Sequence, residues 1–191
     1  MKIHQLSINY LAEQDRIFVR VNTAASEEIR LWFTRRLMLG LWPLLSKLLT
    51  EHLLKLEAAG SSLESADDGL KKMLADFRKE QFLQQADFDT PYDENQQTLP
   101  LGAKPMLVTD VDASPLPSGR IRLTFNERLP NSDEPRNLNL ELDPKLMQGM
   151  MHLLEQALQR SQWQEPFNAS GVMGAAASEE DDPEGKPKYL N

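Results

Sequence analysis

A strand followed by a strongly apolar helix occurs twice in this chain, at residues 27–56 and again at residues 137–160. Before each helix, apolar residues alternate with polar ones, a period of two that predicts a strand with one apolar face. Thr34 and Asp143 then mark the change to helical spacing, because the side chain of each can accept a hydrogen bond from amides of the first helical turn. The fold therefore has to bury two strand–helix units.

The two copies correspond at an offset of 109 residues. The matched pairs are Ile29 and Leu138, Leu31 and Leu140, Phe33 and Leu142, Leu37 and Leu146, Gly40 and Gly149, Leu44 and Leu153. The strands that precede them also match, since residues 16–22 resemble residues 120–126. This self-similarity predicts a tandem duplication, with chance similarity of two strand–helix units as the alternative.

The patterns predict an α+β protein built of two βββα units, each an antiparallel sheet with a packed helix. Strands are expected at 3–10, 16–21, 29–34, 106–111, 120–126 and 137–142, and the closing helix at 144–161. The predicted divisions are a first βββα unit at 1–57, a linker with an extra amphipathic helix at 58–103, a second βββα unit at 104–168 and a disordered acidic tail at 169–191. Residues 90–101 are expected to form a mobile loop.

Two features of the helices carry predictions of their own. Pro43 lies inside the first helix, where a proline removes a hydrogen bond and clashes with the preceding turn, so a kink or restart is expected between Gly40 and Pro43. Glycine inside a helix costs stability, and we therefore expect Gly40 and Gly149 to occupy equivalent close-packed positions.

Composition and charge narrow the class of protein. The net charge is −8, and much of the acid lies in residues 58–103, which carry four basic and nine acidic side chains, and in residues 169–191, which carry two and five. Cysteine is absent, which excludes disulfides and thiolate chemistry. No apolar signal region follows Met1 and no apolar run is long enough for a bilayer, so we expect a cytoplasmic protein with no membrane contact.

Catalytic and metal-binding motifs are weak. The histidines, His4, His52 and His152, have no metal-ligand spacing, and the two on helices are expected to be ordinary, partly exposed side chains. Three acids in or beside the second hairpin loop, Glu127, Asp133 and Glu134, can pair as catalytic carboxylates, but loop acids are usually solvated. We therefore predict no enzyme activity, no cofactor and no metal.

The strongest candidate for a functional surface is the face of the strands that points away from the core. The candidate partner-binding residues are Arg16, Phe18, Arg20, Arg30, Trp32, Arg120 and Arg122. Arginines interleaved with aromatic side chains suit base stacking and phosphate contact, or an aromatic-anchored protein interface. The alternative is a solvated sheet face on which Phe18 and Trp32 pack against the connecting helix.

Two tandem units of antiparallel strands followed by a helix resemble the Whirly and Pur-alpha type nucleic-acid-binding folds. The resemblance lies in the order of elements across both units, and it implies binding of single-stranded nucleic acid.

These observations predict a non-enzymatic protein-binding or adaptor protein, with single-stranded nucleic-acid binding through the arginine and aromatic face as the alternative. A protein partner is expected, and so is a homodimer, because one chain has many leucines to cover; Leu41, Leu48 and Met150 are the candidate dimer contacts. The acidic tail is read either as a docking peptide or as a solubilising segment.

Overall fold

The computed structural model describes residues 1–58, 69, 73, 76–77, 80–82, 84, 86–87, 90–94, 98–130 and 136–163, with the backbone alone for 53–58. The first sheet has the strand order β1-β2-β3-β4. Its strands are β1 (Ile3–Leu11), β2 (Arg16–Thr23), β3 (Glu28–Thr34) and β4 (Met106–Leu107). The first three are antiparallel, and the short β4 joins the edge of β3 in parallel. A 3-10 turn, η1 (Ala12–Gln14), links β1 to β2.

The second sheet is antiparallel and has the order β5-β6-β7. Its strands are β5 (Asp110–Pro115), β6 (Ile121–Glu127) and β7 (Arg136–Leu142). The single strand predicted over 106–111 is wrong, because the chain changes sheets within it. The amide of Val108 donates to the carbonyl oxygen of Trp32 in the first sheet, at 3.0 Å, and the next amide, Thr109, donates to that of Asn126 in the second, at 2.8 Å.

Two long helices begin where their capping residues predict. In α1 (Arg35–Ala58) the amide of Leu37 donates to Oγ1 of Thr34 at 3.3 Å. In α3 (Pro144–Ser161) the amide of Leu146 donates to Oδ1 of Asp143 at 2.8 Å. The predicted restart of α1 does not occur, since Pro43 lies within one continuous helix. Pro43 and Leu39 are both exposed, so the Leu39 carbonyl group, which loses its helical donor, lies on the solvent side.

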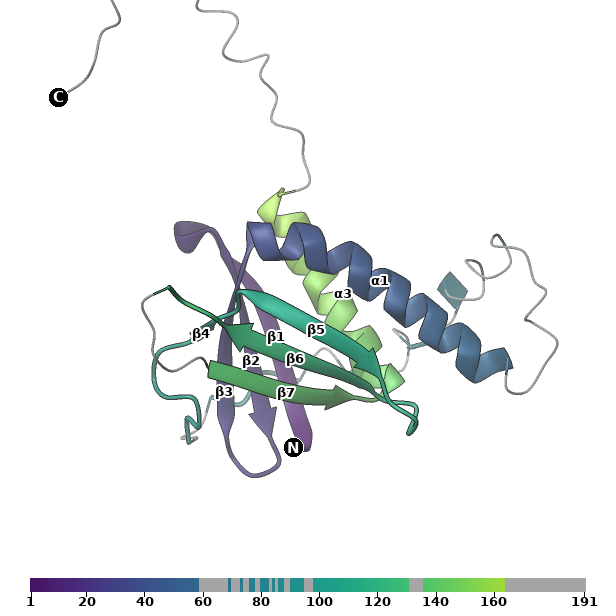
Figure 1. Cartoon of the computed structure of the whole chain (residues 1–191), viewed down its shortest axis with the longest axis horizontal. Coiled ribbons are helices and arrows are strands. Elements are labelled where there is room, and N and C mark those ends of the chain that lie inside the picture. The colour runs from purple at the N-terminus through teal and green to yellow at the C-terminus, as the bar shows by residue number, and fades with distance from the viewer. Residues whose placement is uncertain are drawn as a thin grey trace, which may run out of the picture.

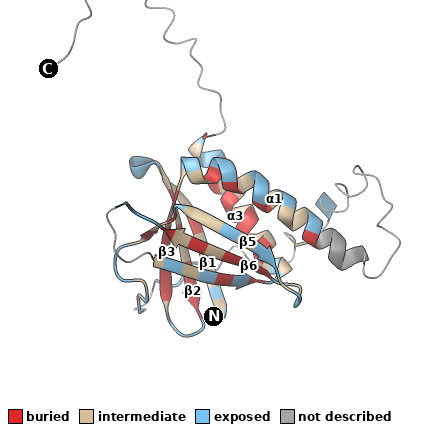
Figure 2. Ribbon diagram, viewed as in Figure 1, coloured by how far each residue is buried: buried red, intermediate tan, exposed pale blue. Residues whose placement is uncertain are grey.

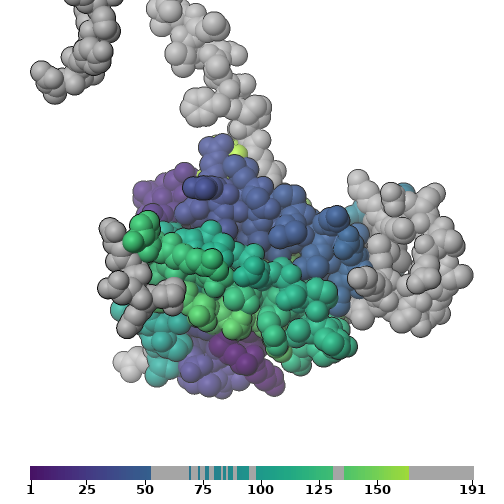
Figure 3. Space-filling view, in the orientation of Figure 1, coloured from purple at the N-terminus to yellow at the C-terminus, as the bar shows by residue number. Residues whose placement is uncertain are grey.

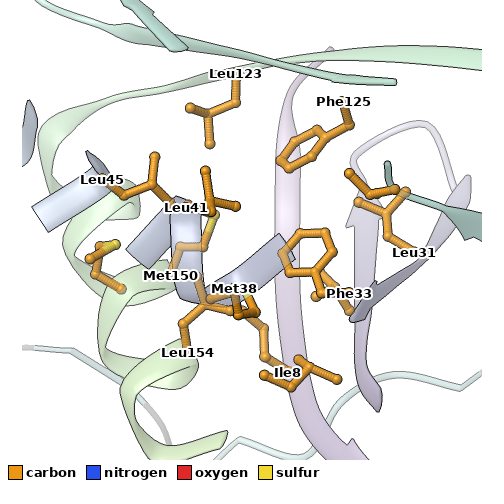
Figure 4. Close-up of a cluster of buried hydrophobic side chains, with 14 of the residues drawn as sticks. Ile8, Leu31, Phe33, Met38, Leu41, Leu45, Leu123, Phe125, Met150 and Leu154 are labelled. Atoms are coloured by element: carbon orange, nitrogen blue, oxygen red, sulfur yellow. The ribbon is translucent and has the colours of Figure 1, made fainter. Parts of the chain in front are cut away.

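One core fills the space between the two sheets and the two helices. The rings of Phe33 and Phe125 stack across it with centroids 5.7 Å apart. Side chains from both sheets and both helices meet there, including Ile8, Leu31, Met38, Leu41, Leu123, Met150 and Leu154 (Figure 4). Leu31 and Leu140 are both buried, as predicted. The mixed α+β content is confirmed.

Each helix packs against strands of both units. The strands of the second sheet run across those of the first, and both helices lie along one side of the two sheets (Figure 1). α3, which follows the second sheet in sequence, packs against β1 of the first, while α1 packs against α3, β3 and β5. Each helix therefore covers the first strand of the other unit. No helix among the described residues is long and apolar enough to cross a bilayer.

The leucines that suggested a dimer are largely covered within one chain. Leu41 and Met150 are buried and Leu48 is half-buried, because α1 and α3 pack against each other (Figure 2). The first two are therefore not free to form a dimer contact. Among the described side chains of α1, the large apolar ones that are exposed are Leu39 and Leu44.

Gly40 and Gly149 differ in their surroundings, so the prediction of equivalent close packing is wrong for Gly40. A Cβ atom built on Gly149 would lie 3.4 Å from the ring of Phe82, whereas one on Gly40 would meet no described atom within 4 Å. We expect Gly40→Ala to raise the free energy of unfolding by about 1 kcal/mol, because helix propensity improves with no steric cost. Chemical denaturation measures this, and a loss of stability would contradict the open environment of Gly40.

Parts of the predicted organisation lie outside the described residues. These are the tail at 169–191, the hairpin residues 131–135 and most of the predicted helix at 69–88. The residues described between 69 and 84 are helical.

Candidate binding face of the first sheet

Five of the seven candidate residues lie together on the side of the first sheet that points away from the core. In the register of β2 and β3, Phe18 is paired with Trp32, and Arg20 with Arg30. Arg16 lies two residues before Phe18 on the same side, and all five side chains are half-buried. We call this surface the outer face; it is defined by Arg16, Phe18, Arg20, Arg30 and Trp32.

A row of four paired residues with an aromatic pair at its centre, the aromatic row, crosses the outer face. The rings of Phe18 and Trp32 have centroids 4.5 Å apart and planes tilted by 33°. Asn9 of β1 is paired with Phe18, and Leu107 of β4 is paired with Trp32, so the row runs across all four strands. A half-buried aromatic pair at the centre of a sheet is the kind of anchor that protein interfaces bury.

Two of the arginines on this face are paired with carboxylates. The guanidinium of Arg20 lies 2.8 Å from Oε1 of Glu94 and 4.2 Å from the ring centroid of Tyr92. That of Arg30 lies 2.9 Å from Oε2 of Glu28, and this hydrogen bond raises the pKa of Arg30. Arg16 forms no ion pair within the described part of the chain. The outer face is therefore less cationic than its sequence predicts.

Residues 90–94 lie across one end of the outer face, where the sequence predicts a mobile loop. The hydroxyl of Tyr92 donates to Oδ1 of Asn22, and Nδ2 of Asn22 donates to the carbonyl oxygen of Asp93 at 2.9 Å. Gln5 makes two further hydrogen bonds, from Nε2 to the carbonyl oxygen of Pro91 at 3.2 Å and from the Asp93 amide to its Oε1 at 2.9 Å. Burial raises the pKa of the Tyr92 hydroxyl far above its usual range.

This strap, residues 90–94, was not identified from the sequence. The only signal for it is Tyr92, a large aromatic side chain in an otherwise polar stretch. The strap covers the end of the face at Asn22 and Arg20, and among the described residues it leaves the aromatic row and Arg16 uncovered.

Arg120 and Arg122 do not belong to this surface. Arg122 belongs to β6 of the second sheet, where it lies opposite Glu141 and forms an ion pair of 2.7 Å. Arg120 immediately precedes β6 and lies 3.9 Å from the same carboxylate. These contacts lower the pKa of Glu141. The buried faces of the two sheets meet in one core, so their outer faces lie on opposite sides of the molecule. The seven candidate residues thus form two separate groups.

Two of the side chains considered for catalysis, Glu127 and His52, make polar contacts within the fold. Glu127 lies at the end of β6 and binds the guanidinium of Arg136, while Asp133 and Glu134 lie outside the described residues. His52 is buried, against expectation. Its Nε2 has a polar partner there, since it lies 2.9 Å from the carbonyl oxygen of Gly119 in the β5–β6 turn. The described residues contain no group of His, Asp and Glu side chains that could hold a metal ion.

Comparison with protein-family models, with curated proteins and with solved structures finds no match to this chain. Its function therefore has to be inferred from the chemistry of its own surfaces. On the outer face that chemistry is an aromatic row beside Arg16, which has no carboxylate partner among the described residues, with the strap across one end.

Proposed function

We propose that this chain is a non-enzymatic adaptor that binds a protein partner on the outer face of the first sheet. The observation that carries the proposal is the half-buried row of Asn9, Phe18, Trp32 and Leu107, which spans four strands beside Arg16. Aromatic and arginine side chains at the centre of a patch supply most of the binding energy in protein interfaces.

Binding of single-stranded nucleic acid is the weaker alternative. Four of the five candidate arginines already have carboxylate partners: Arg20 with Glu94, Arg30 with Glu28, and Arg120 and Arg122 with Glu141. Phosphate binding depends on cations that are free to replace counterions. The strap also brings the carboxylate of Glu94 to the outer face, which opposes the approach of a phosphate backbone.

We also propose that the two units arose by tandem duplication. Each consists of three antiparallel strands followed by a helix, and the helix of each packs on the first strand of the other. The resemblance to Whirly and Pur-alpha type folds remains a proposal of the same kind. The resemblance concerns the order of the elements. The function that it implies, binding of single-stranded nucleic acid, is disfavoured by the ion pairs on the outer face.

Trp32→Ala should weaken binding of a protein partner at least about 30-fold, because an aromatic anchor at the centre of a patch contributes 2 kcal/mol or more. The partner is first captured from cell extract on the full chain, and its affinity is then measured by calorimetry. Arg16→Ala, at the edge of the patch, should have a smaller effect.

Arg122→Ala is the matched control, because it removes a half-exposed arginine from the opposite side of the molecule. It should leave the affinity unchanged. If Trp32→Ala keeps full binding and only lowers the melting temperature, Trp32 is a structural residue and the proposed site is wrong. A gel shift with single-stranded DNA and RNA, steep in its dependence on salt, would favour the alternative function.

A further inference from the structure

Two grooves in the structure are lined by equivalent residues of the two units. The first groove lies between α1 and the β4–β5 segment, and the second between α3 and β1. On the helix side, Leu37, Gly40 and Leu44 of the first correspond to Leu146, Gly149 and Leu153 of the second. On the strand side, Asp110 and Val111 of the first groove correspond to Gln5 and Leu6 of the second, because they hold the same register against β6 and β2. One structural groove therefore occurs twice.

The two grooves differ in what covers them. The second is lined also by the connector between the units, through Phe82, Ala86, Asp87 and Tyr92. The ring of Phe82 lies over Gly149, at 3.4 Å from the position of a Cβ atom. The connector thus supplies the second groove with an aromatic side chain, and glycine gives the ring room.

The first groove has no such cover among the described residues. Its volume is about 570 Å³, no described atom lies within 4 Å of a Cβ built on Gly40, and Leu44 is 51% exposed. It lies on the face of the molecule where α1, drawn in blue, borders the teal β4–β5 segment (Figure 3). Among the described residues, nothing covers this largely apolar groove at Gly40.

The charges at the rim of the first groove indicate the chemistry of an occupant. Arg36 occupies the position that Lys145 has in the second groove, and it forms no ion pair within the described part of the chain. Arg128 adds a second guanidinium, which is largely exposed and lies 3.5 Å from Asp110. An acidic segment suits this rim, and the connector itself carries Asp87 five residues after Phe82.

We propose that the first groove is a docking site for a segment of a partner protein that resembles the connector of this chain. The segment places an aromatic side chain over Gly40, between Leu37 and Leu44, and an acidic side chain toward Arg36. The inference does not depend on the outer face, since Leu107 is the only residue that both the aromatic row and the lining of the first groove include. The carrying observation is the equivalent groove, of about 600 Å³, to whose lining the connector contributes Phe82 against Gly149.

A labelled peptide with the sequence of residues 80–92, EQFLQQADFDTPY, tests the proposal on the full chain. Fluorescence anisotropy should show saturable binding to one site. Leu44→Ser should raise the Kd about tenfold, because one leucine contact is lost. Gly40→Met should do the same by filling the place of the aromatic ring, at a position where an added Cβ atom meets no described atom within 4 Å.

Leu39→Ser is the matched control, because Leu39 lies on the same helix and is 54% exposed, but it does not line the groove. It should change the Kd less than twofold. The proposal is overturned if no saturable binding occurs up to about 1 mM peptide, or if Leu39→Ser weakens binding as much as Leu44→Ser. It is also overturned if Leu153→Ser abolishes binding and Leu44→Ser does not, since the peptide then occupies the second groove. Light scattering that reports a dimer lost in Leu44→Ser would identify a second copy as the occupant and would equally refute it.

Discussion

Trp163→Ala should lower the free energy of unfolding by about 3–5 kcal/mol, the cost of removing a large aromatic side chain from a core. Trp163 is 3% exposed although it follows the end of α3. Its ring packs edge-on against Tyr10 with centroids 5.6 Å apart, and its indole N–H donates to Oδ1 of Asp15 at 2.6 Å. Its carbonyl oxygen accepts a hydrogen bond from Arg35 at 3.0 Å. The residue thereby ties the end of α3 to the β1–β2 turn and to the start of α1.

Trp163→Phe keeps a six-membered aromatic ring in the core and removes the five-membered ring that carries the N–H donor. We expect a smaller loss than in Trp163→Ala, about 1.5–3 kcal/mol, of the size of a hydrogen bond to a charged group. Asp15 provides a second readout. The Trp163 indole, followed by the Tyr10 hydroxyl, holds the pKa of Asp15 below its usual value. In Trp163→Phe that pKa should rise, which NMR titration measures. An unchanged Asp15 pKa would show that the indole contact does not form in solution.

The sequence predicted the elements whose signals are local. Thr34 and Asp143 mark helix starts because each is the last extended residue before a helical period, and both caps form as expected. The alternation in β2, β3 and β6 also gives the buried face of each strand correctly, because the period-2 pattern reports which side meets the core.

The failures concern contacts between distant parts of the chain. The break between β4 and β5 depends on which sheet accepts the hydrogen bond from each amide of residues 107–109. The periodic pattern of apolar residues carries no information about that acceptor. The strap depends on one tyrosine meeting Asn22, 70 residues away. The ion pair of Arg20 depends on where the strap lies, and that of Arg122 depends on the register between β6 and β7. Gly40 and Gly149 share one local motif, yet they differ because Phe82 lies against only one of them.

The second large effect is expected at a buried ion pair that joins the linker to the second sheet. Glu127 is buried, and both of its carboxylate oxygens bind the guanidinium of Arg136. Its Oε1 also accepts from the Leu107 amide at 2.7 Å, while Arg136 donates to the carbonyl oxygens of Leu101, at 3.1 Å, and Lys104, at 3.2 Å. Arg136→Met should therefore cost about 3–5 kcal/mol near pH 7, because it leaves a buried carboxylate without its cation.

The pH dependence of unfolding identifies the cause of that loss. In the native protein the hydrogen bond from Arg136, assisted by the Leu107 amide, holds the pKa of Glu127 below its usual value. A group whose pKa is lowered by folding stabilises the fold above its unfolded pKa, and this contribution disappears as the pH falls through the folded pKa. In Arg136→Met burial instead raises the pKa of Glu127, so acid should favour the folded variant.

The difference in stability between the wild type and Arg136→Met should consequently shrink from about pH 7 to about pH 4, as measured by urea denaturation. Adding Glu127→Gln to Arg136→Met removes the uncompensated charge and keeps an oxygen for the Leu107 amide, so the double variant should be more stable than Arg136→Met near pH 7. If the difference is independent of pH, or if the second substitution recovers nothing, the loss comes from the hydrogen bonds of Arg136 to the carbonyl groups of residues 101–105. Its role would then be to hold the linker in place, with the charge of Glu127 contributing nothing measurable.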